Sequence, residues 1–197
     1  MEVVRAFIAV DLSPEIERSL EQVSSQMQQR LRGVSIRWVP PKNMHLTLKF
    51  LGDVSLSNIE LLKEILQSEA EKHTQFEISV GEVGAFPSIH RPRVIWVGVQ
   101  SPPVLGTIQH DIDVRTARLG YAPEERKFTP HLTLGRVGRN TTSQEAHTIG
   151  EVLSGYPVGF LGAARIEAIH LYRSDLSPQG ARYTRLFSAA LKMPESS

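Results

Sequence analysis

The sequence contains the tetrapeptide His-Leu-Thr-Leu twice, as His45-Leu46-Thr47-Leu48 and as His131-Leu132-Thr133-Leu134. Each copy follows a helix-like segment and a short approach that contains proline, Val39-Pro40-Pro41 in one case and Phe128-Thr129-Pro130 in the other. The interval between the copies is too long for a solenoid repeat. The duplication therefore predicts two similar lobes that face each other.

Each tetrapeptide is expected to form part of a β-strand, in which residues i and i+2 point to the same face. This alternation places His45 with Thr47, and His131 with Thr133, on one face of their strands. The leucines of both copies then point the other way, into a hydrophobic core. Each copy thus presents an imidazole beside a hydroxyl group.

The composition is that of one globular domain, which we expect to span residues 1–197. Hydrophobic residues make up 41% of the chain and charged residues 22%, and the formal net charge is +1. Such a balance provides no bulk basic field for non-specific binding to nucleic acid. The absence of cysteine excludes disulfides and thiolate metal sites. With no secretory signal and no apolar run of about 20 residues, the sequence predicts a cytoplasmic protein that does not enter a membrane.

The remaining pattern predicts an α+β fold with largely antiparallel sheets, because strands and helices are mixed without regular alternation. Strands are expected over Val3–Val10, Phe76–Val83, Arg93–Val99, Arg165–Tyr172 and Arg182–Leu191. Helices are expected from Ser13-Pro14 to Gly33, from a capping box at Ser57–Glu60, from Pro103 to about Leu119, and over Ser143–Ser154. Loops are expected over Gly84–Pro92 and, as a turn, over Ser177–Gly180.

Two imidazoles on facing strands are suited to acid–base chemistry at a phosphodiester, because histidine titrates near pH 6.5 or so. One ring can take a proton from water while the other donates a proton to the leaving oxygen. Thr47 and Thr133 can donate hydrogen bonds to the phosphoryl oxygens. A single His-x-Thr would be read as a structural histidine, but the duplication favours a paired site. A zinc pair is the weaker alternative, since there is no cysteine and no His-x-x-x-His spacing.

At the level of longer segments, the sequence resembles the 2H phosphoesterases, and in particular the bacterial and archaeal RNA 2′,3′-cyclic phosphodiesterases long described as 2′-5′ RNA ligases. The resemblance rests on five segments, Arg5–Asp11, Arg37–Gly52, Gly84–Ser88, Phe128–Arg136, and Leu171–Ser174 with Gly180–Tyr183. It covers nearly the whole chain.

This resemblance implies a bilobal fold of two pseudo-symmetric antiparallel sheets, flanked by helices, around a central cleft. It also implies hydrolysis of a ribose 2′,3′-cyclic phosphate to a 2′-phosphomonoester without metal or cofactor. In this reaction His131 is assigned as the base that activates water, and His45 as the acid that protonates the departing 3′ oxygen. The expected partners are RNA ends or nucleotides with a cyclic phosphate, and the expected state is a monomer.

The resemblance also suggests residues around the histidines. Arg136 resembles a phosphate-binding arginine, although alternation turns it away from His131 unless Gly135 marks a β-bulge. Strand alternation likewise turns Phe50 away from His45. Phe50 and Phe128 resemble base-stacking residues, with core packing as the alternative. Further candidates for the rim of the cleft are Arg126, Lys49, Tyr172 and Arg173, with ordinary surface charge or packing as the alternative.

Two rival functions remain open from the sequence. The first is joining of RNA through a 2′-5′ linkage, which is the same chemistry with a ribose hydroxyl in place of water. The second is a non-catalytic protein that binds RNA ends. A pure phosphate binder would more naturally use arginines than paired histidines, which argues against the second function.

Overall fold

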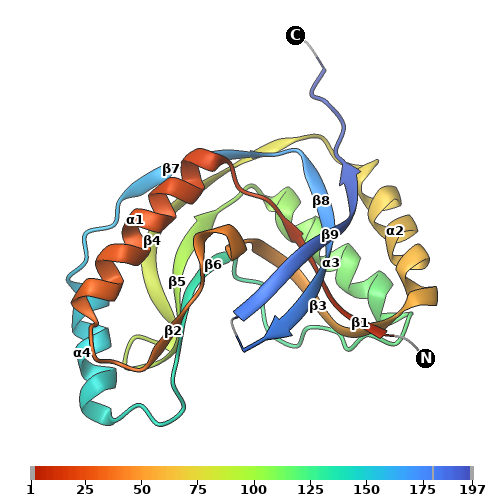
Figure 1. Ribbon diagram of the computed structural model, residues 1–197. Coiled ribbons are helices and arrows are strands. Elements are labelled where there is room, and N and C mark those ends of the chain that lie inside the picture. The colour runs from red at the N-terminus through yellow and green to blue at the C-terminus, as the bar shows by residue number, and fades with distance from the viewer. Residues whose placement is uncertain (1–2, 179, 196–197) are drawn as a thin grey trace.

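The computed structural model describes residues 3–178 and 180–195 and contains two antiparallel β-sheets (Figure 1). The four-stranded sheet has the order β3 (Leu46–Ser55), β1 (Val3–Val10), β8 (Ala168–Ser177) and β9 (Gly180–Ala190). The five-stranded sheet has the order β2 (Ile36–Trp38), β6 (His131–Val137), β5 (Arg91–Gln100), β4 (Phe76–Ser88) and β7 (Phe160–Ile166). The helices are α1 (Pro14–Arg30), η1 (Pro41–Asn43), α2 (Leu56–Ala70), α3 (Pro103–Ala117) and α4 (Ser143–Ser154). The predicted α+β class is confirmed.

The two sheets are related by an internal duplication. The order β3-β1-β8-β9 in one sheet corresponds to β6-β5-β4-β7 in the other, and each motif strand pairs with the strand that precedes it in its own half. The third strand of each sheet comes from the other half of the chain, because β4 pairs with β5 and β8 pairs with β1. The two halves are therefore interleaved rather than joined end to end.

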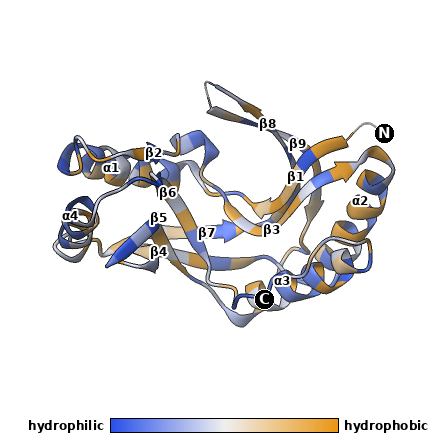
Figure 2. Cartoon of the chain, turned by 90° about the horizontal axis from the view of Figure 1, so that it is seen from below, coloured by the Kyte–Doolittle hydropathy of each residue, from blue (hydrophilic) through white to orange (hydrophobic). Residues whose placement is uncertain are grey.

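The helices follow the same relation. Helices α2 and α3 pack together beside the four-stranded sheet, while α1 contacts β7 and α4 contacts β5 of the five-stranded sheet. Figure 2 shows the strands lying between the pair α1 and α4 on one side and the pair α2 and α3 on the other. No helix of the described residues is long and apolar enough to span a membrane.

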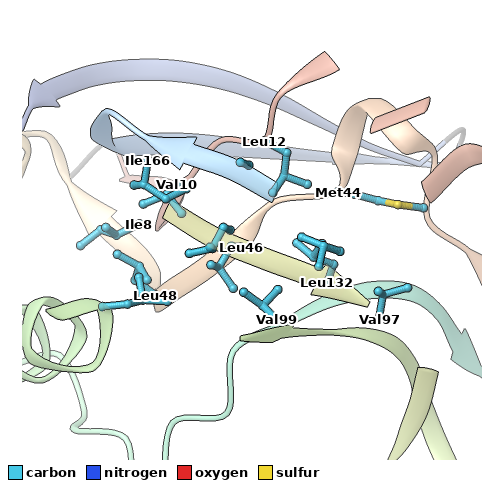
Figure 3. Packing of buried hydrophobic residues seen from close by; sticks show 14 of the residues in the cluster. Ile8, Val10, Leu12, Met44, Leu46, Leu48, Val97, Val99, Leu132 and Ile166 are labelled. Atoms are coloured by element: carbon cyan, nitrogen blue, oxygen red, sulfur yellow. The ribbon is translucent and has the colours of Figure 1, made fainter. Parts of the chain in front are cut away.

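A continuous hydrophobic core connects both sheets. Leu46 and Leu48 of β3 and Leu132 of β6 belong to one cluster of buried residues (Figure 3). Leu46 and Leu132 are both fully buried, so the two motifs are anchored in the same core. The predicted inward direction of these leucines is confirmed.

Several predicted boundaries are confirmed. The side chain of Ser13 accepts a hydrogen bond from the Ile16 amide, so it caps α1, and Pro14 is the first helical residue. Gly33, with φ of +90°, follows the end of this helix, as expected for a glycine that terminates it. Helix α4 has the predicted bounds, with a capping box formed by Thr142 and Glu145.

The predicted start of α2 is wrong by two residues. The helix is capped by Ser55 rather than Ser57, and the Ser55 hydroxyl accepts a hydrogen bond from the Asn58 amide at 3.3 Å. Ser55 is also the last residue of β3 and has an extended backbone, as an N-cap residue requires. The strand therefore passes directly into the helix.

Two predictions for the β-structure are also wrong. The expected loop over Gly84–Pro92 belongs mostly to a long hairpin, because β4 continues to Ser88 and β5 begins at Arg91. A register shift between Phe86 and Pro87 accommodates proline in the pairing. The strand expected over Arg165–Tyr172 is divided at Glu167, where the chain leaves one sheet and enters the other.

The turn predicted over Ser177–Gly180 joins β8 to β9, which confirms the expected hairpin. The Ser177 hydroxyl donates a hydrogen bond to the Gly180 carbonyl at 2.9 Å. Gln179 lies outside the described residues.

Candidate active site

The two motif strands have the same local geometry. Residues 46–51 and 132–137 alternate between buried and accessible positions in the same order. In β3 the pairing with β1 skips Leu48, and in β6 the pairing with β5 skips Leu134. Each strand therefore carries a β-bulge at the second leucine of its motif.

The bulge settles the direction of the residues that follow. One extra residue reverses the alternation, so Phe50 and Arg136 return to the same face as the histidine of their own motif. Phe50 is 65% exposed, with its ring 6.1 Å from that of Phe7 on this face. Arg136 is exposed as well. The bulge that was expected at Gly135 lies one residue earlier, at Leu134, and it turns Arg136 to the face of His131 as predicted.

His131 is held at the start of β6 by its ring nitrogen Nδ1, which lies 2.7 Å from the Thr129 carbonyl oxygen. A carbonyl can only accept, so Nδ1 carries the proton and the neutral ring has its lone pair on Nε2. The Phe86 ring packs edge-on against the imidazole, at 4.9 Å between centroids. Burial lowers the pKa of His131; the Thr129 hydrogen bond opposes this shift, and the charge of Arg136 adds to it. His131 is therefore neutral near pH 7.

His45 immediately precedes β3 and lies in an aromatic enclosure. The ring centroids of Tyr172, Tyr183 and Phe7 lie 4.8, 5.6 and 6.1 Å from that of His45, all edge-on. Nδ1 of His45 is buried and has no hydrogen-bond partner among the described residues. Nε2 lies 3.8 Å from a carboxylate oxygen of Asp11, the residue that follows β1.

The Asp11 carboxylate has further neighbours on β8 and β9. The Tyr172 hydroxyl donates a hydrogen bond to it at 2.6 Å, and the Arg185 guanidinium forms an ion pair with it. Nε2 of His170 lies 3.5 Å from its other oxygen. Burial, together with the hydrogen bond to Asp11, raises the pKa of Tyr172 to about 12, so the hydroxyl remains protonated.

His170 of β8 is buried beside the site. Its Nδ1 lies 2.8 Å from the Ser188 hydroxyl. Burial lowers the pKa of His170; the negative charge of Asp11 opposes that shift, and Arg185 reinforces it. His170 therefore supports Asp11 as a neutral ring.

A cavity of about 870 Å³ lies beside His45. It is bordered by η1, by the end of β1, and by the hairpin of β8 and β9. Lys42, Arg182 and Arg185 contribute positive charge to it, and Asp11 and Glu17 contribute negative charge. His131 is not among its lining residues, so this cavity extends from one half of the duplicated site only.

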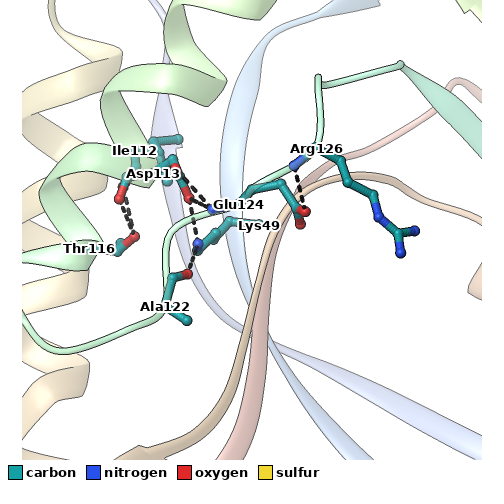
Figure 4. A network of polar contacts seen from close by, with 7 residues as sticks. All are labelled: Lys49, Ile112, Asp113, Thr116, Ala122, Glu124 and Arg126. Atoms are coloured by element: carbon teal, nitrogen blue, oxygen red, sulfur yellow. Dashed lines mark hydrogen bonds and ion pairs between the residues drawn. The ribbon is translucent and has the colours of Figure 1, made fainter.

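Lys49 was predicted at the rim of the cleft and is instead buried. The bulge at Leu48 turns Lys49 toward the core side, where its ammonium forms an ion pair with Asp113 of α3 and donates to the Ala122 carbonyl (Figure 4). The Asp113 carboxylate also accepts hydrogen bonds from the Glu124 amide at 3.1 and 3.2 Å. The network connects β3 to the segment that leads to His131.

The other predicted residues divide into two groups. Tyr172 lies at the site, but it is only 5% exposed and its ring stacks on Phe7, so it forms a wall of the site. Arg173 lies on the opposite face of β8 and pairs with Asp175, so the prediction for the cleft rim is wrong. Arg126 is exposed in the segment between α3 and β6, and Phe128 packs partly buried against the main core.

Six residues near the histidines were not predicted as site residues, namely Phe7, Asp11, Phe86, His170, Tyr183 and Arg185. They come from other strands of the two sheets, or directly follow one, and most of these strands are not the immediate neighbours of the motif strands. Asp11 had a detectable signal, as a charged residue directly after a run of buried strand residues. For the others the strand order had to be known. Among the described residues, no three histidine, aspartate or glutamate side chains are placed to hold a metal ion.

Comparisons with known proteins support the duplication. The family described as LigT-like phosphoesterase matches the chain twice, over residues 10–96 and 97–183. The RNA 2′,3′-cyclic phosphodiesterase of Methanothermobacter thermautotrophicus is 35% identical, covering 92% of this chain and 95% of its own. That of Aquifex aeolicus is 33% identical, covering 93% and 95%.

Solved structures agree with the sequence relatives. The crystal structure of Escherichia coli LigT complexed with 3′-AMP has a TM-score of 0.77 and 28% identity, covering 96% of this chain and 99% of that one. TT0787 of Thermus thermophilus has a TM-score of 0.78 and 25% identity, covering 95% and 97%. The predicted resemblance is confirmed: the chain belongs to the LigT-like phosphoesterase family of two-histidine phosphoesterases.

Proposed function

We propose that the protein hydrolyses 2′,3′-cyclic phosphates at the ends of RNA, or in nucleotides, to 2′-phosphomonoesters. One observation carries the proposal: a duplicated His-x-Thr site lies in a chain matched over more than nine-tenths of its length by relatives named RNA 2′,3′-cyclic phosphodiesterase. The 3′-AMP complex of E. coli LigT supports a nucleotide as the ligand class.

In the proposed reaction, Nε2 of His131 removes a proton from water as the water oxygen attacks phosphorus. The bond from phosphorus to the 3′ oxygen breaks, and His45, acting as an imidazolium ion, gives the proton on Nε2 to that oxygen and becomes a neutral ring. The products are a 2′-phosphomonoester and a free 3′-hydroxyl, and both histidines then exchange protons with solvent. The neutral state and the free Nε2 lone pair of His131 support its role as the base.

Thr47, Thr133 and Arg136 are proposed to bind the phosphoryl oxygens, where negative charge accumulates during attack. The bulges support this role for Arg136, because they turn it to the face that carries His131 and Thr133. Phe50 is proposed to stack on a nucleobase, and its exposed ring on the His45 face supports this. Arg126 and Phe128 remain candidates for contacts farther along an RNA strand.

Product analysis tests the proposal. A 2′,3′-cyclic nucleotide and an oligonucleotide with a cyclic phosphate end are incubated with the protein, and the products are identified by 31P NMR. We expect only the 2′-phosphomonoester, at a rate unaffected by a chelator. Release of 3′-phosphate alone, or no turnover of either substrate, contradicts the proposal.

Two variants separate catalysis from binding. His45→Ala and His131→Ala are expected to bind the cyclic-ended oligonucleotide within about threefold of the wild-type affinity and to lose at least about 100-fold in kcat. His90→Ala, a change in the exposed turn between β4 and β5, provides the matched control and should retain the wild-type rate. Turnover by either active-site variant at the wild-type rate contradicts the assigned chemistry.

A further inference from the structure

The cavity beside His45 lies on the side of the site toward which the leaving oxygen departs. In an in-line displacement, the attacking water and the departing 3′ oxygen occupy opposite sides of the phosphorus. His131 lies on the side of the water in the proposed reaction, and His45 lies on the side of the 3′ oxygen. Because the ribose carries that oxygen, the nucleoside and everything attached to it lie on the His45 side. The cavity of about 870 Å³ is lined by His45 and not by His131.

The nucleobase and the 5′ chain of the substrate leave the ribose at opposite ends. The base is bonded to the ring carbon next to the one that carries the 2′ oxygen. The 5′ carbon is bonded to the ring carbon next to the one that carries the 3′ oxygen. Phe50, the proposed stacking residue, follows His45 along β3, whereas η1 and Met44, which line the cavity, precede it. With the base at Phe50, the 5′ chain therefore points toward the cavity.

The walls of the cavity are joined to each other. The η1 helix forms one wall, and the hairpin of β8 and β9 forms the other. The side-chain amide of Asn43 donates a hydrogen bond to the Ala181 carbonyl at 2.7 Å, which connects the two walls. Pockets for small ligands have volumes of about 300–1,000 Å³, and this cavity lies in the upper part of that range. It is thus a preformed space that can hold a nucleotide in addition to the cyclic phosphate.

Arg185 is held rigidly beside the cavity. Its Nε donates a hydrogen bond to the Tyr172 hydroxyl at 3.2 Å, and one terminal nitrogen pairs with the Asp11 carboxylate. The His170 ring and the Tyr172 hydroxyl contact the same carboxylate. The Arg185 side chain nevertheless remains 50% exposed, and a guanidinium has further N–H groups that can donate. This network, which the proposed reaction does not use, presents a fixed guanidinium to a ligand in the cavity.

The cavity contains more positive than negative charge. Lys42, Arg182 and Arg185 line it on the positive side, and Asp11 and Glu17 line it on the negative side. Because Asp11 is paired with Arg185, two cations and one carboxylate remain. Among the described residues, the lysines with ion pairs are Lys49, Lys63 and Lys72. The exposed Lys42 is therefore available to an anion. A charge surplus this small suits one anionic group held locally.

We propose that the cavity binds the phosphate attached to the 5′ oxygen of the terminal nucleotide, through Lys42 and Arg185. The inference rests on the proposed function, because the placement of the ribose follows from it. It adds a choice of substrate to that function. A nucleoside 2′,3′-cyclic phosphate lacks the 5′ phosphate, whereas the end of an RNA strand has it as a phosphodiester, so the protein should prefer RNA ends.

Matched substrates test the proposal. We would measure kcat/KM for adenosine 2′,3′-cyclic phosphate, for the adenosine dinucleotide with a cyclic phosphate end, and for that dinucleotide with an uncharged methylphosphonate as its internal linkage. The phosphodiester dinucleotide should exceed both others about tenfold, because they lack charge-assisted hydrogen bonds to the 5′ phosphate. Equal values for the phosphodiester and the methylphosphonate overturn the proposal.

A fourth substrate distinguishes an RNA strand from a phosphorylated nucleotide as the source of the phosphate. Adenosine 2′,3′-cyclic phosphate that also carries a 5′ phosphate should exceed its unphosphorylated form about tenfold if the phosphate alone is recognised. A smaller gain, with the charged dinucleotide still preferred over its methylphosphonate, assigns the site to an RNA strand. Both results support a 5′-phosphate site.

A variant tests the residues. In Lys42→Gln, the ratio of kcat/KM for the phosphodiester to that for the methylphosphonate should fall from about tenfold to about threefold or less. The ratio compares two substrates of one protein, so a general loss of activity cancels. The matched control is Arg173→Gln, which removes a positive charge from the opposite face of β8 and should keep the ratio within about twofold of wild type. An unchanged ratio in Lys42→Gln overturns the proposal.

Binding separates this inference from the proposed function. If the wild type hydrolyses none of the cyclic phosphates, the proposed function fails, and the cavity is tested without turnover. Isothermal titration calorimetry with the 2′-phosphorylated dinucleotide and its methylphosphonate analogue should give Kd values about tenfold apart in wild type and closer together in Lys42→Gln. Equal Kd values for the two ligands in wild type overturn the inference, whether or not the protein is active.

Discussion

Arg136 and His131 interact on one face of β6, and this interaction has a consequence for the pH dependence. Burial and the charge of Arg136 both lower the pKa of His131 below its ordinary value of 6.5. A base must be unprotonated, so kcat/KM should fall only below the lowered pKa, and the acidic limb of the pH–rate profile should lie below pH 6.5. Removing the charge in Arg136→Gln makes protonation of His131 easier and should move this limb to higher pH.

Arg136→Gln should also lower the maximal kcat/KM, because phosphate binding is weaker. The pH of the acidic limb is fitted separately from that maximum, so the two effects can be distinguished. Arg165→Gln serves as a control, because this arginine is exposed on β7 and pairs with Glu77. It should leave the limb in place. An unchanged or more acidic limb in Arg136→Gln would show that its charge does not act on the base.

Gly84 is required for packing, because the Trp96 side chain occupies the space where a Cβ atom would lie. It lies opposite Trp96 in the hairpin of β4 and β5, and a Cβ atom at this position would overlap the indole ring. Gly84→Ala should therefore destabilise the protein by about 1–3 kcal/mol in urea unfolding, as overpacked sites do. Gly106→Ala in α3, where the new methyl meets nothing within 4 Å, should instead stabilise the protein by about 0.5–1 kcal/mol. Equal effects of the two changes would refute this account.

For single residues, the sequence predicted the side-chain directions inside each motif. It did not predict which residues of other strands lie near the histidines. The directions of His45, Thr47 and the core leucines follow from alternation alone. The directions of Arg136 and Phe50 depend on bulges, whose positions are set by pairing with β5 and β1. Lys49 was misplaced for the same reason. Asp11 and Arg185 are far apart in the chain and meet only when β9 joins the sheet beside β8.

At the scale of elements, the ion pair between Lys49 and Asp113 connects β3 to α3 and to the segment before β6. Lys49 is 5% exposed, so its removal leaves a carboxylate in a poorly hydrated position. Lys49→Met should lower the free energy of unfolding by about 3–5 kcal/mol, as measured in urea. The double variant Lys49→Met/Asp113→Asn should lose less, because the neutral amide can still accept from the Glu124 amide.

The control for this pair is Lys63→Met, which breaks a pair with the exposed Glu60 on α2. Its effect should stay within about 0.5 kcal/mol. A double variant at Lys49 and Asp113 that is less stable than Lys49→Met would mean that Asp113 does not depend on Lys49 for compensation.

Helices were more predictable than strands because their end signals are local. The side chains that cap α1 and α4 lie within three residues of the amides they bind, so the start of each helix is encoded locally. The bounds of α4 were predicted without error. The division at Glu167 has no such local sign, since apolar residues continue on both sides while the chain passes from β7 to β8. Which sheet a strand joins depends on the other strands present.

At the scale of the whole molecule, the duplication could be predicted from the two motifs, but the exchange of strands between halves could not. Because β4 of the first half pairs with β5, and β8 of the second half pairs with β1, neither half of the chain contains all the strands of its own sheet. The core cluster likewise contains residues from both sheets. The two lobes are thus expected to unfold as one cooperative unit.

The tryptophans provide a test of this cooperativity, because both, Trp38 in β2 and Trp96 in β5, belong to the five-stranded sheet. Leu62→Ala removes a fully buried side chain from α2, beside the other sheet, and should cost about 2–5 kcal/mol. In a cooperative molecule the urea midpoint from tryptophan fluorescence should fall as far as that from far-UV circular dichroism. Leu153→Ala in α4 should move both midpoints together as well. If Leu62→Ala leaves the fluorescence midpoint at the wild-type value, the lobes unfold separately and the exchanged strands do not couple them.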